Sequence, residues 1–180
     1  FILFVYIIPN LYLKKIIIDY APGDKIDTKP FNITIKSGNS SFNKVNVNSK
    51  WLINKATKFN ISVKDYTTEI KEVRIDTLDN YCKNNNIKTI DLLKIDTQGY
   101  EDKVLKGGIN FLQKNSIKIV LTELMFDNAY DRYLSFSDVE KFLLPNNFRM
   151  VAIELDNDIL FKRPTFSGDI CYLNKNFYNL

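Results

Sequence analysis

Residues 90–123 read IDLLKIDTQGYEDKVLKGGINFLQKNSIKIVLTE, and this stretch decides the fold. The apolar runs Ile90–Ile95 and Ile117–Leu121 are typical of strands that are covered on both faces. Between them, Tyr100–Gln113 places its apolar residues along one side of a helix. A strand, a helix and a second strand in this order predict two neighbouring parallel strands joined by a right-handed crossover.

The sequence on either side continues this alternation of strands and helices. Before the stretch, Ile70–Ile75 is a strand candidate, and Thr77 can cap a short helix that runs through Cys82. After it, Ser137–Glu140 forms a capping box that opens a helix, which Pro145 ends.

The last part of the chain predicts closing strands at Phe148–Leu155, Ile159–Lys162 and Asp169–Asn174. The turn residues Asp156–Asp158 lie between the first two and predict an antiparallel hairpin.

The first third is less regular. Phe1–Ile8 is an apolar run that Pro9 interrupts, so it is too short to span a membrane, and we interpret it as a buried strand of a larger sheet. A signal-peptide core is the competing interpretation. Short strands are expected at Ile16–Tyr20 and Phe31–Lys36, with a helical turn around Trp51.

Length and composition fit one folded domain. The 180 residues are 45% hydrophobic and 26% charged, which is ordinary for a globular protein. We therefore predict that residues 1–180 form a single α/β domain with a mostly parallel sheet and a closing antiparallel hairpin.

The residue types exclude several kinds of chemistry. The chain has no histidine, which removes Ser-His-Asp and Cys-His nucleophile systems and histidine-based metal sites. Its two cysteines, Cys82 and Cys171, lie far apart in the sequence, which favours reduced thiols and a cytoplasmic protein.

The formal charge of +4 comes from scattered lysines, so no nucleic-acid partner is expected. An RNA-binding role would rest only on the pI of 8.9 and the 13% of aromatic residues.

Two acidic residues follow consecutive predicted strands. Asp96 ends the first and Glu123 follows the second, and ligands of open α/β sheets bind at the carboxyl ends of strands. Neighbouring strands lie about 4.8 Å apart, so we expect both carboxylates in one cleft, where they could act on a hydroxyl or hold Mg²⁺, Ca²⁺ or Mn²⁺. The alternatives are that Asp96 caps the following helix and that Glu123 pairs with a lysine.

Three glycines lie close to this site. Gly99 permits a tight strand-to-helix turn, and a turn is its favoured role. Gly107–Gly108 lies inside the helical pattern, where it would let the helix pack closely on the sheet.

The run Asp91–Glu101, which continues through Val104–Gly108, resembles the FkbM methyltransferase family. The resemblance extends backward to Arg74–Asp79 and forward to Thr122–Glu123 and to Gly168–Tyr172. It covers residues 70–175 well, and residues 21–24 and 40–42 resemble the preceding strand and loop more loosely.

The resemblance implies a Rossmann-like class I methyltransferase fold, with S-adenosylmethionine as the methyl donor. It also implies transfer to a hydroxyl of a sugar, a glycan or a natural-product scaffold. Asp96 is then the expected catalytic base with Glu123 as its partner, and Asp24 is expected on the adenine side of the cofactor. The substrate is expected against three consecutive residues: Gly99, Tyr100 and Glu101.

One part of the family pattern is missing. Phe1–Tyr20 contains no glycine, so neither the glycine loop after the first strand nor the acidic residue after the second can be found. We therefore expect an N-terminally truncated domain that binds S-adenosylmethionine weakly or not at all. The alternative function is a non-catalytic remnant or binding module that has the same fold.

Overall fold

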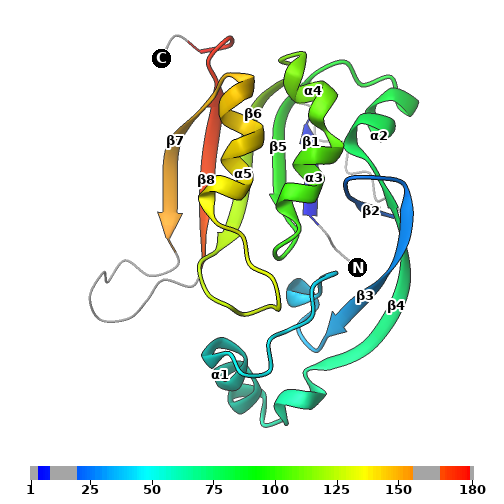
Figure 1. Ribbon diagram of the computed structural model, residues 1–180, viewed down its shortest axis with the longest axis vertical. Helices are drawn as coiled ribbons and strands as arrows, with labels where there is room; N and C mark the ends of the chain where they lie inside the picture. Colours follow the sequence, from blue (N-terminus) through cyan, green and yellow to red (C-terminus); the bar gives the residue numbers. More distant parts are fainter. Residues whose placement is uncertain (1–3, 9–19, 156–166, 179–180) are drawn as a thin grey trace.

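The computed structural model describes residues 4–8, 20–155 and 167–178. In these ranges the chain forms two β-sheets and five α-helices (Figure 1). The predicted strand Ile159–Lys162, the turn Asp156–Asp158 and all of the predicted strand Ile16–Tyr20 except its last residue lie outside the described residues.

The larger sheet has the strand order β1-β5-β6-β8-β7. Its strands are β1 (Phe4–Ile8), β5 (Ile90–Asp96), β6 (Ile117–Met125), β7 (Phe148–Leu155) and β8 (Ser167–Asn174). β5 and β6 are adjacent and parallel, which confirms the prediction made from residues 90–123.

The prediction of a mostly parallel sheet is wrong, because the larger sheet is mixed. Of the four strand pairs that the structure describes in it, only β5 with β6 is parallel. Parallel neighbours need a long crossover connection, and β5 and β6 are joined by one that contains two helices. β8 instead returns antiparallel between β6 and β7, and β1 runs antiparallel along β5.

A second sheet of three strands has the order β2-β4-β3. It consists of β2 (Ala21–Pro22), β3 (Asp27–Thr34) and β4 (Thr67–Asp76). The predicted strand Ile70–Ile75 lies in β4, and the predicted strand Phe31–Lys36 overlaps β3, which begins four residues earlier and ends two residues earlier than expected. The long β3–β4 ladder is antiparallel and curves away from the larger sheet (Figure 1).

Helices cover one face of the larger sheet and one end of the molecule (Figure 1). α3, α4 and α5 lie over the sheet, α2 lies beside them, and α1 lies at the lower end near the 3₁₀ turns η1 and η2. Their bounds are Lys50–Phe59 for α1, Leu78–Asn84 for α2, Glu101–Gly107 for α3, Ile109–Gln113 for α4, Phe136–Leu143 for α5, Ser37–Asn39 for η1, Val63–Asp65 for η2 and Leu144–Asn146 for η3.

The predicted single helix Tyr100–Gln113 is in fact two helices that meet at Gly108. A Cβ atom at Gly107 would lie 1.9 Å from the carbonyl oxygen of Gly23, and one at Gly108 would lie 2.7 Å from Leu78. The carboxylate of Asp79 accepts hydrogen bonds from the first backbone N–H groups of α4. The glycine pair therefore packs against β2 and α2, and not only against the sheet as expected.

Two predicted helix caps have different outcomes. The side chain of Thr77 accepts a hydrogen bond from the backbone N–H of Asn80, which confirms the cap of α2. The capping box of α5 lies two residues earlier than expected, since the carboxylate of Asp138 accepts hydrogen bonds from the backbone and hydroxyl of Ser135. α5 ends at Leu143, before Pro145, as predicted.

The buried apolar residues form two clusters. The larger lies between β5, β6, β8 and the helices α2 to α5. The smaller packs α1 against the segment after β6, and its fully buried aromatic centre is Tyr66.

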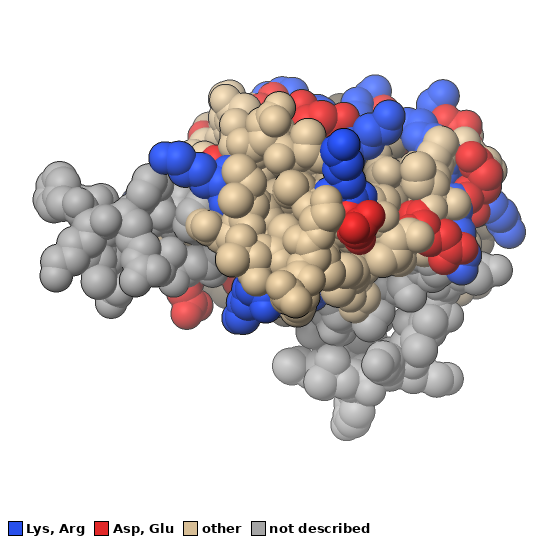
Figure 2. Space-filling view, turned by 90° about the horizontal axis from the view of Figure 1, so that it is seen from below, with Lys and Arg blue, Asp and Glu red and all other residues tan. Residues whose placement is uncertain are grey.

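No helix in the described ranges is long and apolar enough to cross a membrane. Seen from below, the molecule shows charges of both signs arranged mainly around an uncharged centre (Figure 2).

Candidate functional site

The site begins with a strained turn between β5 and α3. Gln98 has a φ angle of 54° and Gly99 one of 88°, so two consecutive residues adopt the left-handed region. The φ angle of Gly99 strains any residue with a side chain, and a Cβ atom there would also lie 3.2 Å from the carbonyl oxygen of Arg132. The expected turn role of Gly99 is therefore confirmed.

Neighbouring segments fasten the backbone of this turn. The hydroxyl of Ser41 donates to the carbonyl oxygen of Gln98 at 2.9 Å. The amide of Asn43 and the guanidinium of Arg132 donate to the carbonyl oxygen of Gly99 at 2.8 and 3.2 Å. These contacts stabilise a backbone conformation that would otherwise cost about 1 to 3 kcal/mol for Gln98.

Glu101 closes the turn from inside. Its carboxylate accepts hydrogen bonds from the backbone and hydroxyl of Thr97 at 2.8 and 3.0 Å and from the backbone of Gly99 at 3.2 Å. Burial raises the pKa of Glu101 to about 7, although these hydrogen bonds oppose the shift. Glu101 thus organises the backbone that presents Gln98.

The structure places Tyr100 behind the turn. The ammonium of Lys29 donates to its hydroxyl at 3.1 Å, and its ring packs 4.8 Å from that of Phe42. Gly99, Tyr100 and Glu101 are all buried, and their polar groups form hydrogen bonds with other residues of the chain. Their role in substrate binding stays a prediction.

The same turn connects the two acidic residues that the sequence singled out. Asp96 is the last residue of β5, and Glu123 lies on the neighbouring strand β6, two residues before its end. The side-chain amide nitrogen of Gln98 donates to both carboxyl groups, at 3.0 Å to Asp96 and 2.6 Å to Glu123. We call Asp96 and Glu123 the carboxyl pair.

Glu123 of the carboxyl pair has a raised pKa. Burial, followed by the charge of Asp96 and a hydrogen bond with it, raises the pKa of Glu123 from 4.5 to about 8. Two neighbouring carboxyl groups in a partly buried place cannot both ionise easily, so at neutral pH the pair holds one proton, on Glu123. A group that exchanges a proton near pH 8 is suited to general acid–base chemistry.

Two further residues support the pair and were not identified from the sequence. The hydroxyl of buried Tyr130 lies 3.0 Å from the amide oxygen of Gln98 and 2.8 Å from the carbonyl oxygen of Asn39, and it can donate its one hydrogen to either. Gln98 lies inside the run Asp91–Glu101 that resembles the family, so the sequence contained a signal that could have identified it. Tyr130 is 32 positions away in the sequence, and no local pattern marks it.

Asp169 extends the row of acids across the sheet. It lies opposite Glu123 in the β6–β8 pair and opposite Glu154 in the β7–β8 pair. One of its oxygens is buried and lies 3.9 Å from the ammonium of Lys94. The charge of Asp169 also contributes to the raised pKa of Glu123.

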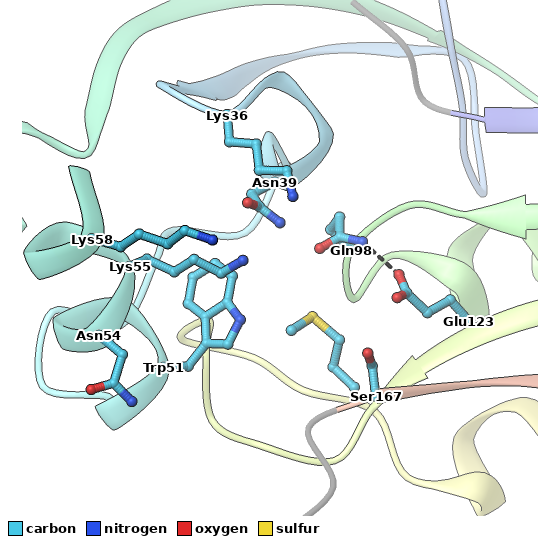
Figure 3. A pocket seen from close by; sticks show the side chains of 10 residues that line it. Lys36, Asn39, Trp51, Asn54, Lys55, Lys58, Gln98, Glu123 and Ser167 are labelled. Carbon is cyan, nitrogen blue, oxygen red and sulfur yellow. Dashed lines mark hydrogen bonds between the residues drawn. The ribbon is translucent and has the colours of Figure 1, made fainter. Parts of the chain in front are cut away.

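An open cavity of about 470 Å³ lies next to the carboxyl pair (Figure 3). Gln98 and Glu123 form one side of it, and lysine side chains extend into it from the other side. The lining residues are Lys36, Asn39, Trp51, Asn54, Lys55, Lys58, Gln98, Glu123, Met125 and Ser167.

The carboxyl pair does not fit a divalent cation well. In the described parts of the chain no three acidic or cysteine side chains come together as metal ligands. The space between Asp96 and Glu123 faces the amide nitrogen of Gln98, which is a hydrogen-bond donor and not a ligand.

The structure places Asp24 apart from this network. Its carboxylate lies 3.1 Å from the ammonium of Lys106 and 3.7 Å from that of Lys103, both on α3. Burial would raise the pKa of Asp24, but the hydrogen bond from Lys106 and the two positive charges lower it. Asp24 therefore joins the end of β2 to α3, and its role toward a cofactor stays a prediction.

Comparison with known proteins adds one finding. Residues 8–150 match the family model described as the methyltransferase FkbM domain. No curated protein and no solved structure matches the chain.

Proposed function

The chain belongs to the FkbM methyltransferase domain family, and we propose that it transfers a methyl group from S-adenosylmethionine to a hydroxyl of a sugar, a glycan or a natural-product scaffold. The observation that carries this proposal is the carboxyl pair, which shares the amide of Gln98 and borders an open cavity. That residues 1–180 form one domain stays a prediction. A cytoplasmic location stays a prediction.

The carboxyl pair acts on the acceptor. Once Glu123 has lost its own proton, a hydroxyl that lies against it donates a hydrogen bond to the Glu123 carboxylate and transfers its proton to it as the oxygen becomes a nucleophile. Gln98 holds the two carboxyl groups in place with one nitrogen, so it acts as a positioning residue. Such proton transfer contributes about 10² to 10⁴-fold to a rate, and alignment of the reactants contributes the larger part.

When it is bound, S-adenosylmethionine supplies a methyl group on a positively charged sulfur. On the donor side the described residues fit poorly, because the carboxylate of Asp24 is already paired with two lysines. We therefore expect weak binding of S-adenosylmethionine to this chain, and the described residues are assigned to the acceptor side only.

The test is methyl transfer at millimolar S-adenosylmethionine, measured as the formation of S-adenosylhomocysteine with a panel of sugars as acceptors. We expect transfer by the natural sequence and a loss of about 100-fold or more in Asp96→Asn and in Glu123→Gln. Both substitutions keep the shape of the side chain, and circular dichroism checks the fold. Equal rates in all three proteins would remove the carboxyl pair from the mechanism.

A binding module without catalysis is the second function to consider, and the ion pairs of Asp24 favour it. Calorimetry with S-adenosylmethionine separates the two. Saturable binding, even at millimolar concentration, supports the enzyme, whereas the absence of any binding supports the module.

A further inference from the structure

The side of the cavity that faces the carboxyl pair is basic. Lys36 precedes η1, and Lys55 and Lys58 belong to α1. In Figure 3 the two α1 lysines extend toward the side of the cavity where Gln98 and Glu123 lie. We call Lys36, Lys55 and Lys58 the lysine cluster.

The arrangement follows from the sequence of α1. Trp51, Asn54, Lys55 and Lys58 are spaced three, four and seven residues from the first, so they share one face of the helix. All four line the cavity, while Leu52 on another face is fully buried in the smaller core cluster. The helix is therefore anchored by Leu52 and by the largely buried Trp51, and it offers amide and ammonium groups to the cavity.

Two members of the lysine cluster, Lys36 and Lys58, are not neutralised by the acids that the structure describes. Neither Lys36 nor Lys58 forms an ion pair with a described carboxylate. The ammonium of Lys55 lies 5.5 Å from the centre of the Trp51 ring. Among the described residues, Glu123 is the one acid that lines this cavity, and its raised pKa means that it is protonated at neutral pH.

We propose that the acceptor carries an anionic oxygen group, a phosphate or a carboxylate, which the lysine cluster binds while a neutral hydroxyl of the same molecule reaches the carboxyl pair. This inference rests on the proposed function and specifies its substrate class. The two ends of the cavity orient such a molecule in one direction, because its anion is drawn to the lysines and its hydroxyl can form a hydrogen bond with Glu123. A cavity of about 470 Å³ has room for a monosaccharide-sized acceptor.

The remaining lining groups suit a sugar. The side-chain amide of Asn54 and the amide nitrogen of Asn39 offer hydrogen-bonding groups for hydroxyls, and an edge of the Trp51 ring is apolar. The cationic sulfur of S-adenosylmethionine, in contrast, would be repelled by three ammonium groups. The side of the cavity that the lysine cluster lines is therefore better suited to the acceptor than to S-adenosylmethionine.

The test is an NMR titration of the 180-residue chain with four compounds: inorganic phosphate, glucose 6-phosphate, glucuronate and glucose. We expect the three anions to shift the backbone amide signals around the lysine cluster and glucose to bind about tenfold more weakly than its phosphate. Added salt should weaken the anions and leave glucose unchanged. A preference for glucose 6-phosphate or for glucuronate identifies the anionic group.

Substitution of exposed lysines tests whether the lysine cluster is the binding site, with a lysine outside the cavity as the control. Lys36→Gln combined with Lys58→Gln should weaken the anions by about tenfold, whereas Lys50→Gln, on the same helix but outside the cavity lining, should not. Binding of glucose as tight as that of its phosphate, full anion affinity in the double variant, or no binding of any anion would each overturn the inference. The titration contains no methyl donor, so its outcome does not depend on methyl transfer. If the anions bind here but the methyl-transfer assay shows no activity, the proposed function is wrong and the inference about anion binding stands.

Discussion

Gln98 is the residue that joins the two halves of the site. Its backbone adopts a left-handed φ of 54°, which is unfavourable for a residue with a side chain. Its amide nitrogen serves both carboxyl groups, and its amide oxygen lies within hydrogen-bonding distance of Tyr130. A strained backbone at the centre of a polar network indicates that the position is maintained for what its side chain does.

Replacement of Gln98 by methionine keeps the length of the side chain and removes the donor. An amide donor favours the ionised carboxyl group, so its loss should raise the pKa of Glu123 further. The pH at which methyl transfer reaches half its maximum should therefore move upward from about 8 in Gln98→Met. An unchanged pH profile with a normal fold would show that the amide does not govern the pair.

At the scale of the element, the turn between β5 and α3 depends on a buried acid. Burial raises the pKa of Glu101 to about 7 in the folded chain, whereas a glutamate in an unfolded chain has a pKa of 4.5. Because the pKa is higher in the folded chain, protonated Glu101 contributes its full stabilisation of the fold below pH 4.5. This contribution is lost as the pH rises to 7. The loss amounts to about 3 kcal/mol over this window.

Glu101→Gln keeps an oxygen acceptor for the turn and removes the titration. We expect the free energy of unfolding of the natural chain to fall relative to that of Glu101→Gln as the pH rises from 4.5 to 7. Urea unfolding at several pH values measures both curves. Parallel curves for the two proteins would mean that Glu101 titrates normally.

The junction of α3 and α4 provides a second test at this scale. In Gly107→Ala the new methyl group would overlap the carbonyl oxygen of Gly23, so we expect a loss of about 3 kcal/mol in stability. Gly38→Ala is the matched control, because no atom lies within 4 Å of a Cβ there. Similar midpoints of urea unfolding for both variants would contradict the packing described here.

The elements predicted correctly are those whose signals are local. The strands β5 and β6 and the Thr77 cap follow from residues that are near one another in the sequence. The cap of α5 was placed two residues late because Ser135 and Ser137 each stand three residues before an acid, and the sequence cannot choose between them. The break at Gly108 depends on distant Gly23 and Leu78, so a helical period alone does not reveal it.

At the scale of the whole molecule, one ion pair ties the loop after β6 to α3. Arg132 makes two hydrogen bonds, of 3.0 and 2.7 Å, to the carboxylate of Asp102, whose side chain is 7% exposed. The same guanidinium also contacts Gly99 in the turn of the site. The loop that carries Tyr130 is thereby attached to the helix that follows Gln98.

Arg132→Met should destabilise the chain by about 2 to 3 kcal/mol, because it leaves the charge of Asp102 buried without a partner. Adding Asp102→Asn should recover part of that loss, since the uncompensated charge is then gone. Thermal unfolding of the two variants measures this coupling. Additive effects of the two substitutions would show that the pair contributes little.

The whole-molecule features are those that the sequence revealed least. The strand ends of Asp96 and Glu123 could be predicted from parallel pairing, and the structure brings the two together. The division into two sheets, the antiparallel neighbours and the approach of α1 to the site depend on contacts between distant segments. No pattern of nearby residues marks Lys36, Lys55 and Lys58 as one cluster.

The central claim is that Asp96 and Glu123 form a pair that holds one proton at neutral pH. A ¹³C NMR titration of the side-chain carboxyl of Glu123 tests it most directly and needs neither donor nor acceptor. The account predicts a midpoint at about pH 8 in the natural chain and a lower midpoint in Asp96→Asn, where the neighbouring charge is removed. A midpoint near 4.5 in the natural chain would contradict it.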